Sequence, residues 1–284
     1  MAIPYRTANF RRRWGRACVP KMEVVQEYSC QLGTAVVCGG AAVTLFYFFR
    51  KWIGGGVCRS QARLDGKTVI ITGANTGIGL ETAVDLAKRN ARVILACRSV
   101  ERGETAAVEV RKRSGNDKVV FVQLDLASLD SVRKFAAKIL EEEPRIDILI
   151  NNAGMHSPHV SRTEEGFERH MGVNHLGPFL LTNLLLDRLK EAPSARIVNV
   201  SSLLYKRCKT FEFDKMNSDD PTRVGTRKNI AYNQSKLANI LFTRALAKRL
   251  VGTRVTVNVL HPGLIRTELA RDTTSTYSWL GRVS

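Results

Sequence analysis

Acidic residues are scarce in this sequence, and their scarcity narrows the choice of partner. The 284 residues include 26 Asp and Glu against 44 Lys and Arg, which gives a formal net charge of +18. A strongly basic chain favours an anionic partner, either nucleic acid or a membrane surface. The sequence has no aromatic–basic motif of the kind that binds nucleic acid, so we expect a membrane partner and no nucleic acid.

Paired cysteines are also lacking. The six cysteines form neither a C-x-x-C pair nor a spacing that is typical of a metal site. We interpret them as reduced thiols on a cytosol-like side, and no metal is expected. Internal repeats and low-complexity tracts are absent too. With 44% hydrophobic residues, the length suits one large α/β domain plus a tail.

The beginning of the chain has the pattern of a membrane anchor. Residues 1–31 are basic, and residues 32–49 carry no charge and end in a run of aromatic residues. This length just reaches what a membrane-spanning helix requires. We expect a retained transmembrane anchor; a buried helix, a cleaved signal and an imported presequence are the alternatives. Residues 50–64 form a glycine-containing linker, and the soluble domain spans 65–284.

A glycine-rich stretch follows the first predicted strand. Residues 67–71 are mostly β-branched, and residues 80–87 have apolar side chains at helical spacing. Between them lies Gly73-Ala74-Asn75-Thr76-Gly77-Ile78-Gly79. Strand, glycine turn and helix in this order are typical of a dinucleotide site, because the glycines let a pyrophosphate approach the N–H groups of the helix. An ordinary tight turn is the alternative.

The rest of the domain continues the alternation of strands and helices. Strands are predicted at 92–98, 119–124, 146–150, 195–200 and 255–260, and helices at 100–113, 130–142 and 166–190. This alternation predicts an α/β fold with a doubly wound parallel sheet of the Rossmann type.

Two residues at strand ends bear on the choice of cofactor. Arg98 follows the second strand, where many NAD enzymes have an acid that binds the ribose hydroxyls. An arginine can pair with a 2′-phosphate that an acid would repel, so we expect NADP(H); a plain surface arginine is the alternative. Asp125 follows the third strand. It either accepts a hydrogen bond from the adenine amino group or caps the next helix through Ser128.

The middle of the domain contributes two asparagine features. Asn151-Asn152-Ala153-Gly154 can brace neighbouring strands and let the cofactor ribose approach, or it is an Asn-rich turn. Pro178 lies four residues after Asn174 in the long predicted helix. Because proline has no N–H, it should kink the helix and leave the carbonyl of Asn174 unpaired, where it could hold a water.

Tyr232 and Lys236 are four residues apart and therefore share a helix face. A nearby ammonium should lower the pKa of the tyrosine from its usual value of about 10. Tyr232 would then donate or accept a proton near neutral pH. A serine at the exit of the preceding strand could hold a carbonyl oxygen while a nicotinamide exchanges hydride. Residues 203–229 are predicted to form a long basic loop over the site.

Taken together, these motifs resemble the short-chain dehydrogenase/reductase superfamily over about residues 65–267. The resemblance implies that Tyr232 is the general acid/base and that Lys236 binds the nicotinamide ribose and tunes Tyr232. It also implies that Ser202, the second serine of its pair, orients the carbonyl and that Asn174 holds a relay water. The cofactor-binding residues that it implies are Gly73, Asn75, Thr76, Gly77, Ile78, Gly79, Arg98, Asp125, Leu126, Asn152, Ala153, Gly154, Tyr232, Lys236, Pro262, Gly263 and Thr267.

Within that superfamily, the segments at 55–59, 72–79, 95–98, 172–177 and 235–239 are similar to the membrane-anchored retinol dehydrogenases. This similarity implies interconversion of retinal and retinol with NADP(H). It also implies an endoplasmic reticulum anchor and a catalytic domain that faces the cytosol. The basic N-terminus leaves a mitochondrial membrane as the alternative. Reduction of other lipid aldehydes, ketones or steroids is the alternative activity.

Two features depart from that branch. Pro178 stands where the branch usually has histidine, and the chain stops about 17 residues after Thr267. The family continues there with a further helix and a last strand, so we expect both to be missing. A catalytically inactive, truncated cofactor-binding protein is therefore the rival hypothesis. The oligomeric state is left open, a homo-oligomer included.

Overall fold

The computed structural model describes residues 37, 39–51, 58–224, 229–263 and 265. The chain divides into two compact units, Met1–Ser60 and Gln61–Ser284. In the first unit, residues 39–51 form a helix with exposed side chains, Phe46 and Phe49 among them. No helix within the described residues is long and apolar enough to cross a membrane. Part of the predicted anchor, residues 32–36 and 38, lies outside the described residues.

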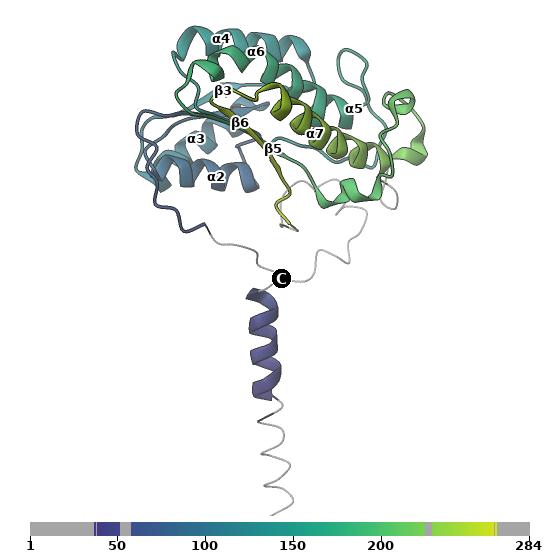
Figure 1. The fold of residues 1–284 in the computed structure, drawn as a ribbon, viewed down its shortest axis with the longest axis horizontal. Helices are drawn as coiled ribbons and strands as arrows, with labels where there is room; N and C mark the ends of the chain where they lie inside the picture. Colours follow the sequence, from purple (N-terminus) through teal and green to yellow (C-terminus); the bar gives the residue numbers. More distant parts are fainter. Residues whose placement is uncertain (1–36, 38, 52–57, 225–228, 264, 266–284) are drawn as a thin grey trace, which may run out of the picture. The chain divides into compact units, whose positions relative to one another are not determined.

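The second unit is built on a parallel six-stranded sheet in the order β3-β2-β1-β4-β5-β6, with helices on both faces (Figure 1). The strands are β1 (Thr68–Thr72), β2 (Arg92–Cys97), β3 (Val119–Gln123), β4 (Ile148–Asn151), β5 (Ala195–Val200) and β6 (Val255–Leu260). β1 pairs with both β2 and β4, so the strand order reverses between β1 and β4. Ligands of such sheets bind outside the carboxyl ends of the strands at this reversal. The doubly wound Rossmann prediction is confirmed.

The connections between strands are mostly helical. The longer helices are α2 (Gly77–Lys88), α3 (Val100–Ser114), α4 (Leu129–Glu142), α6 (Gly177–Glu191) and α7 (Ile230–Arg249). The shorter ones are α5 (Arg169–Met171), η1 (Gly172–Leu176), η2 (Leu203–Arg207), η3 (Phe213–Lys215) and η4 (Pro221–Arg223).

Alternating side chains of the central strands form two hydrophobic cores. Ile70 of β1 is fully buried against the layer of α4 and α6, with the end of α7. Val69 and Ile71 are fully buried against α2 and α3 on the opposite face. Successive residues of a strand point to opposite faces, so an uninterrupted apolar strand serves both layers. Packing on both faces keeps the carboxyl ends of the strands in position, and with them the loops that follow.

The long helix predicted over 166–190 is present, but it begins at Arg169 and contains a π-helical turn. The structure has α5, then the π-helical turn η1, then α6. The N–H of Gly177 donates to the carbonyl of Gly172, five residues back, which is the wider spacing of a π turn. Pro178 follows directly at the start of α6, where its missing N–H is tolerated. The irregularity in this helix is therefore a π turn just before the proline.

The described part of the predicted loop, residues 203–224, contains the three short helices η2, η3 and η4. Its position is determined by polar contacts. The Arg223 guanidinium is buried and forms an ion pair with Glu212 at 2.7 Å. Gln234 of α7 accepts the N–H of Glu212 and donates to the carbonyl of Thr210. This segment is therefore fastened to α7.

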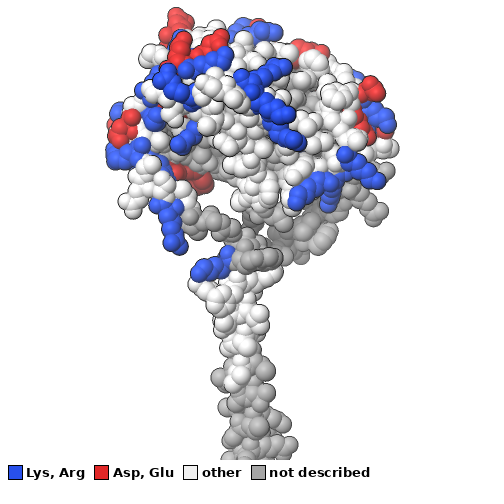
Figure 2. All heavy atoms as spheres, viewed as in Figure 1, with Lys and Arg blue, Asp and Glu red and all other residues white. Residues whose placement is uncertain are grey.

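Charged side chains are spread over the surface of this unit. On the face shown in Figure 2, Lys and Arg form several separate groups, with Asp and Glu among them. Some basic residues pair with acids of the same face of a helix or of a neighbouring helix. Arg113 of α3, for example, contacts Glu81 of α2 and Glu109 of α3.

Gly103→Ala should destabilise the fold, although alanine usually stabilises a helix by about 1 kcal/mol relative to glycine. A Cβ at Gly103 of α3 would lie 2.2 Å from the Phe121 ring of β3. We expect a loss of about 1–3 kcal/mol in the free energy of unfolding, measured by urea denaturation, because overpacking forces neighbours to move. Glu104→Ala, on the same helix, is the control. Adding Phe121→Leu should restore part of the loss; a stabilised Gly103→Ala variant would contradict the prediction.

Candidate active site

Two glycines of the turn after β1, Gly73 and Gly79, have no space for a side chain. Gly73 has φ +65°, and a Cβ there would lie 2.8 Å from the Cα of Ala153. A Cβ at Gly79 would lie 2.4 Å from the carbonyl oxygen of Gly73 and 2.6 Å from Nδ2 of Asn152. Both positions therefore require glycine, because a Cβ at either one would collide with the turn after β4.

The turn after β4, residues 151–154, braces the neighbouring strands, which is one of the two alternatives that the sequence left open. Asn152 Nδ2 donates to the carbonyls of Thr72 and Gly73, at 2.9 and 3.2 Å. The N–H of Ala153 donates to the hydroxyl of Thr72 at 3.0 Å. Asn151 Nδ2 donates to Asn199 of β5 at 2.8 Å. The amides thus connect β1, β4 and β5 where these strands end.

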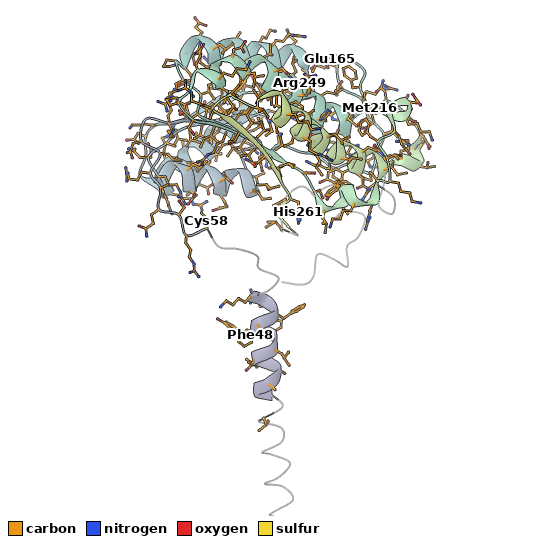
Figure 3. All side chains as sticks on the ribbon, in the orientation of Figure 1. Phe48, Cys58, Glu165, Met216, Arg249 and His261 are labelled. Carbon is orange, nitrogen blue, oxygen red and sulfur yellow. The ribbon has the colours of Figure 1, made fainter. Side chains whose placement is uncertain are left out.

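A cleft of about 650 Å³ opens at this edge of the sheet. Most of the residues that the sequence singles out line it: Gly73, Asn75, Thr76, Gly77, Ile78, Gly79, Arg98, Asp125, Leu126, Asn152, Ala153, Gly154, Ser202, Tyr232, Lys236, Pro262 and Gly263. His261, labelled in Figure 3, follows β6 and directly precedes Pro262 and Gly263. Asn174 is buried and lies outside this lining, and Thr267 lies outside the described residues.

Several lining residues were not predicted from the sequence. Arg102, His156, Ser157, Ser161 and Arg169 all face the cleft. Arg102 had a usable signal, since it is a second arginine close to Arg98, in the first turn of the helix that follows. The other four had none, because they belong to the irregular segment before α5 or to α5 itself.

The end of the cleft at β2 and β3 carries positive charge. Arg98 is exposed at the end of β2, and Arg102 lies in the first turn of α3. Burial raises the pKa of the Cys97 thiol to about 11, so this lining residue stays uncharged at neutral pH. The carboxylate of Asp125 accepts the N–H of Ala127, while Ser128 caps α4 through its own hydroxyl. Asp125 therefore lines the cleft without capping the helix.

The residues at the turn fit a dinucleotide pyrophosphate. The first turn of α2 has neither a side-chain cap nor an acidic residue, so its N–H groups face the cleft uncompensated. Helix N-termini attract anions through these groups and through the helix dipole. The missing Cβ atoms of Gly73 and Gly79 let the backbone come close.

The other end of the cleft is formed by β5 and α7. Tyr232 and Lys236 of α7 are 5% and 3% exposed, with the Lys236 amine 5.7 Å from the centre of the Tyr232 ring. Lys236 Nζ donates to the carbonyl of Val200 at 3.1 Å. Ser202 forms a side-chain hydrogen bond with Tyr232. Ser201 instead donates its hydroxyl to the carbonyl of Lys236, which leaves Ser202 as the serine beside the phenol.

Burial dominates the electrostatics of this pair. It raises the pKa of Tyr232, an effect that the hydrogen bond from Ser202 reduces but does not cancel. It also lowers the pKa of Lys236 to about 8. The expectation that Lys236 lowers the pKa of Tyr232 is therefore wrong for this structure, because burial disfavours the charged form of both groups.

Asn174 is held from several sides in η1. Its Oδ1 accepts the N–H of Met155 at 2.7 Å, and its Nδ2 donates to the carbonyl of Met155 and to Ser235. Its backbone carbonyl accepts Nδ2 of Asn239 at 3.0 Å. The prediction that this carbonyl is unpaired is thus wrong: the π turn orients it toward α7. A carbonyl has two lone pairs, so one remains available to a water.

The fold and the cleft together define a dinucleotide-binding α/β protein with a buried tyrosine and lysine at one end. A family model described as short chain dehydrogenase matches residues 67–208 and 218–278. The chain belongs to the short-chain dehydrogenase family and is an oxidoreductase of the alcohol dehydrogenase type.

Curated relatives agree with this assignment. The chain is 53% identical to human (Homo sapiens) retinol dehydrogenase 13 over 250 residues, which cover 88% of this chain and 73% of that protein. It is 53% identical to human retinol dehydrogenase 12 over 222 residues, which cover 78% and 69%. A solved actinorhodin polyketide ketoreductase with NADPH has a TM-score of 0.62 at 29% identity, covering 78% of this chain and 80% of that one.

Lys236→Met should stabilise the cofactor-free protein at pH 7, and this gain should shrink as the pH rises from about 8 to about 10. The folded pKa of Lys236 is about 8, against 10.5 for an ordinary lysine. Between these values the unfolded chain binds more protons, so the wild type gains stability as the pH rises. The difference between the folded and unfolded pKa of Lys236 corresponds to a change in the free energy of unfolding on the order of 3 kcal/mol, since one pKa unit is worth about 1.4 kcal/mol.

Thermal unfolding midpoints of both proteins at pH 7 and pH 9.5 would measure this change. Lys248→Met, which replaces an exposed lysine of the same helix, is the matched control and should show no such dependence. An equal effect of Lys236→Met at both pH values would refute the burial argument.

Proposed function

We propose that this chain is an NADP(H)-dependent oxidoreductase that interconverts retinal and retinol. One observation carries the proposal: a single cleft has Arg98 and Arg102 at one end and Ser202, Tyr232 and Lys236 at the other. The relatives named retinol dehydrogenases support the retinoid substrate.

The reacting end of the cleft suits proton transfer to a carbonyl oxygen. The hydroxyls of Ser202 and Tyr232 are hydrogen-bonded to each other, so one carbonyl oxygen can be held by both. In the reductive direction Tyr232 gives its proton to that oxygen and Ser202 orients it. The nicotinamide, when bound, supplies or accepts the hydride.

Lys236 assists through its charge. Burial keeps its pKa near 8, so its amine is still largely protonated at neutral pH. In the cofactor-free structure burial raises the pKa of Tyr232; once a bound cofactor compensates for this burial, an ammonium at Lys236 would stabilise the phenolate that forms as the proton leaves. A hydrogen-bond acceptor near Nζ, such as the ribose hydroxyls of the cofactor, would further favour the ammonium. The proposed role of Asn174 is to hold a relay water at its second carbonyl lone pair.

The preference for NADP(H) over NAD(H) rests on the end of β2. An acid that binds the ribose hydroxyls is missing there, and two arginines line the cleft, one directly after β2 and one in the first turn of α3. Guanidinium groups pair with phosphate through several N–H donors at once. Asp125 and Leu126, which line the same end, are proposed to contact the adenine.

We also propose that the N-terminal segment anchors the enzyme to the endoplasmic reticulum membrane, with the catalytic unit facing the cytosol. The uncharged residues 32–49 and the exposed aromatic side chains of the helix at 39–51 support attachment to a lipid phase. A mitochondrial membrane is the alternative. An apolar substrate that partitions into lipid fits either location.

The 284-residue chain in detergent should oxidise NADPH in the presence of all-trans-retinal, and Tyr232→Phe should reduce turnover at least about 100-fold, the typical contribution of a general acid. NADPH should still bind the variant, because only the hydroxyl is lost. Tyr205→Phe, on the neighbouring segment, is the control. Turnover of a medium-chain aldehyde alone would remove the retinoid assignment. NADPH binding without any turnover would favour a catalytically inactive cofactor-binding protein.

Replacing both Arg98 and Arg102 with alanine should raise the Kd for NADPH about 10- to 100-fold and leave the Kd for NADH within about twofold. The reason is that only the 2′-phosphate loses its charge-assisted hydrogen bonds. Fluorescence titration with both nucleotides would measure the change. Arg113→Ala, which removes another arginine of α3, should change neither affinity. Equal losses for the two nucleotides would place the arginines elsewhere than at the 2′-phosphate.

A further inference from the structure

A buried carboxylate–imidazole pair lies beside Tyr232 and has no part in the reaction described above. Glu168 and His170 are 4% and 1% exposed, and His170 Nδ1 lies 2.7 Å from Oε1 of Glu168. The Glu168 carboxylate also accepts the N–H groups of His170 and Met171, at 3.0 and 2.9 Å. Burial raises the pKa of Glu168, but its hydrogen bond and electrostatic interaction with His170, together with the two backbone N–H groups, outweigh burial and hold the pKa below its ordinary value. The pair is therefore a fully bonded, charged group in the interior.

The contacts of His170 determine its tautomer. The N–H of Ser157 donates to His170 Nε2 at 3.0 Å. Because a backbone N–H can only donate, Nε2 carries the lone pair and Nδ1 carries the proton that is given to Glu168. The ring can satisfy both partners in this orientation alone, so the pair fixes the position of the Ser157 backbone.

The segment from Met155 to Ser157 is consequently held at both ends. Asn174 accepts the N–H of Met155 and donates to its carbonyl, while His170 accepts the N–H of Ser157. His156 lies between these two attachments. Its Nε2 is 3.0 Å from Oδ1 of Asn229, the residue that precedes α7 and has φ +48°. The segment is thus joined to the start of the helix that carries Tyr232.

Two imidazole rings contact each other and the same side of the Tyr232 ring. The centre of the His156 ring lies 5.3 Å from that of Tyr232 at 80°, and the His170 ring lies 6.3 Å away at 84°. These are edge-to-face contacts between aromatic rings. The phenol oxygen lies on the axis about which the ring turns, so the backbone and the χ1 angle of Tyr232 set its position, and these ring contacts restrict χ1.

We propose that Glu168 and His170 are positioning residues for Tyr232, acting through the backbone of Ser157 and the ring of His156. The inference rests on the proposed role of Tyr232 as the proton donor. Catalysis requires the phenol oxygen within hydrogen-bond reach of the substrate oxygen, and a displacement of about 1 Å can cost about 100-fold in rate. The pair adds to this precision from a second element: α7 holds the backbone of Tyr232, and the His156 and His170 rings restrict the χ1 angle that places the phenol oxygen.

The test compares His170→Leu, which removes the acceptor for Ser157, with His170→Gln, whose amide oxygen can replace it. His159→Leu changes an exposed histidine of the same segment and is the matched control. Turnover of retinal, the Kd for NADPH, and hydrogen–deuterium exchange of the peptide that covers residues 155–157 are measured on the full chain in detergent.

We expect His170→Leu to lower kcat at least about 10-fold while the Kd for NADPH stays within about twofold, because an interaction of the reacting state is lost and cofactor binding is not. Exchange at residues 155–157 should accelerate in the same variant. His170→Gln should restore both kcat and protection. An unchanged kcat in folded His170→Leu would overturn the proposal, as would a His170→Gln variant as impaired as His170→Leu.

A second variant covers the case in which His170→Leu does not fold. His156→Ala keeps the buried pair and removes the ring that contacts both His170 and Tyr232, so kcat should fall while the exchange of Ser157 stays slow. A kcat within about twofold of wild type would refute the transmission through His156. If the wild type itself turns over no carbonyl substrate, the proposed function fails. The exchange comparison of the two His170 variants then still decides whether the pair holds residues 155–157.

Discussion

The architecture of the site depends on one hydrogen-bonded junction, where the side-chain amide of Asn152 binds the carbonyls of Thr72 and Gly73. This amide joins the exits of β1 and β4, the two strands between which the strand order reverses. It leaves no space for a Cβ at Gly79, and it directs the first turn of α2 toward the cleft. The pyrophosphate position therefore follows from contacts between two turns that are far apart in the sequence.

The helix α7 is held in a different way. Asn233, Gln234, Ser235 and Lys236 form a run of buried polar residues, whereas a surface helix normally buries an apolar stripe. Each of the last three binds another element: Gln234 the segment before η3, Ser235 the amide of Asn174, and Lys236 the carbonyl of Val200. Buried polar groups are costly unless they are bonded, so these partners fix both the rotation and the depth of the helix.

The two ends of the cleft thus differ in what surrounds them. Arginines at the end of β2 and in α3 create a positive, solvent-accessible end. At the other end, burial raises the pKa of Tyr232 and lowers that of Lys236, so charge is disfavoured until a bound partner compensates it. This contrast matches a cofactor whose phosphates bind at one end and whose reacting ring lies at the other.

From the sequence alone, the alternation of apolar strands and amphipathic helices determined the sheet, and β5 and β6 have the predicted bounds. The glycine spacing and the four-residue interval between Tyr232 and Lys236 are likewise local patterns with a direct physical reading. Only the tertiary structure decided the π turn at η1, the pairing of the Asn174 carbonyl with Asn239, and the direction of the pKa shift of Tyr232. It alone brought His170 beside Tyr232, because each of these features depends on burial and on partners that the chain supplies from distant segments.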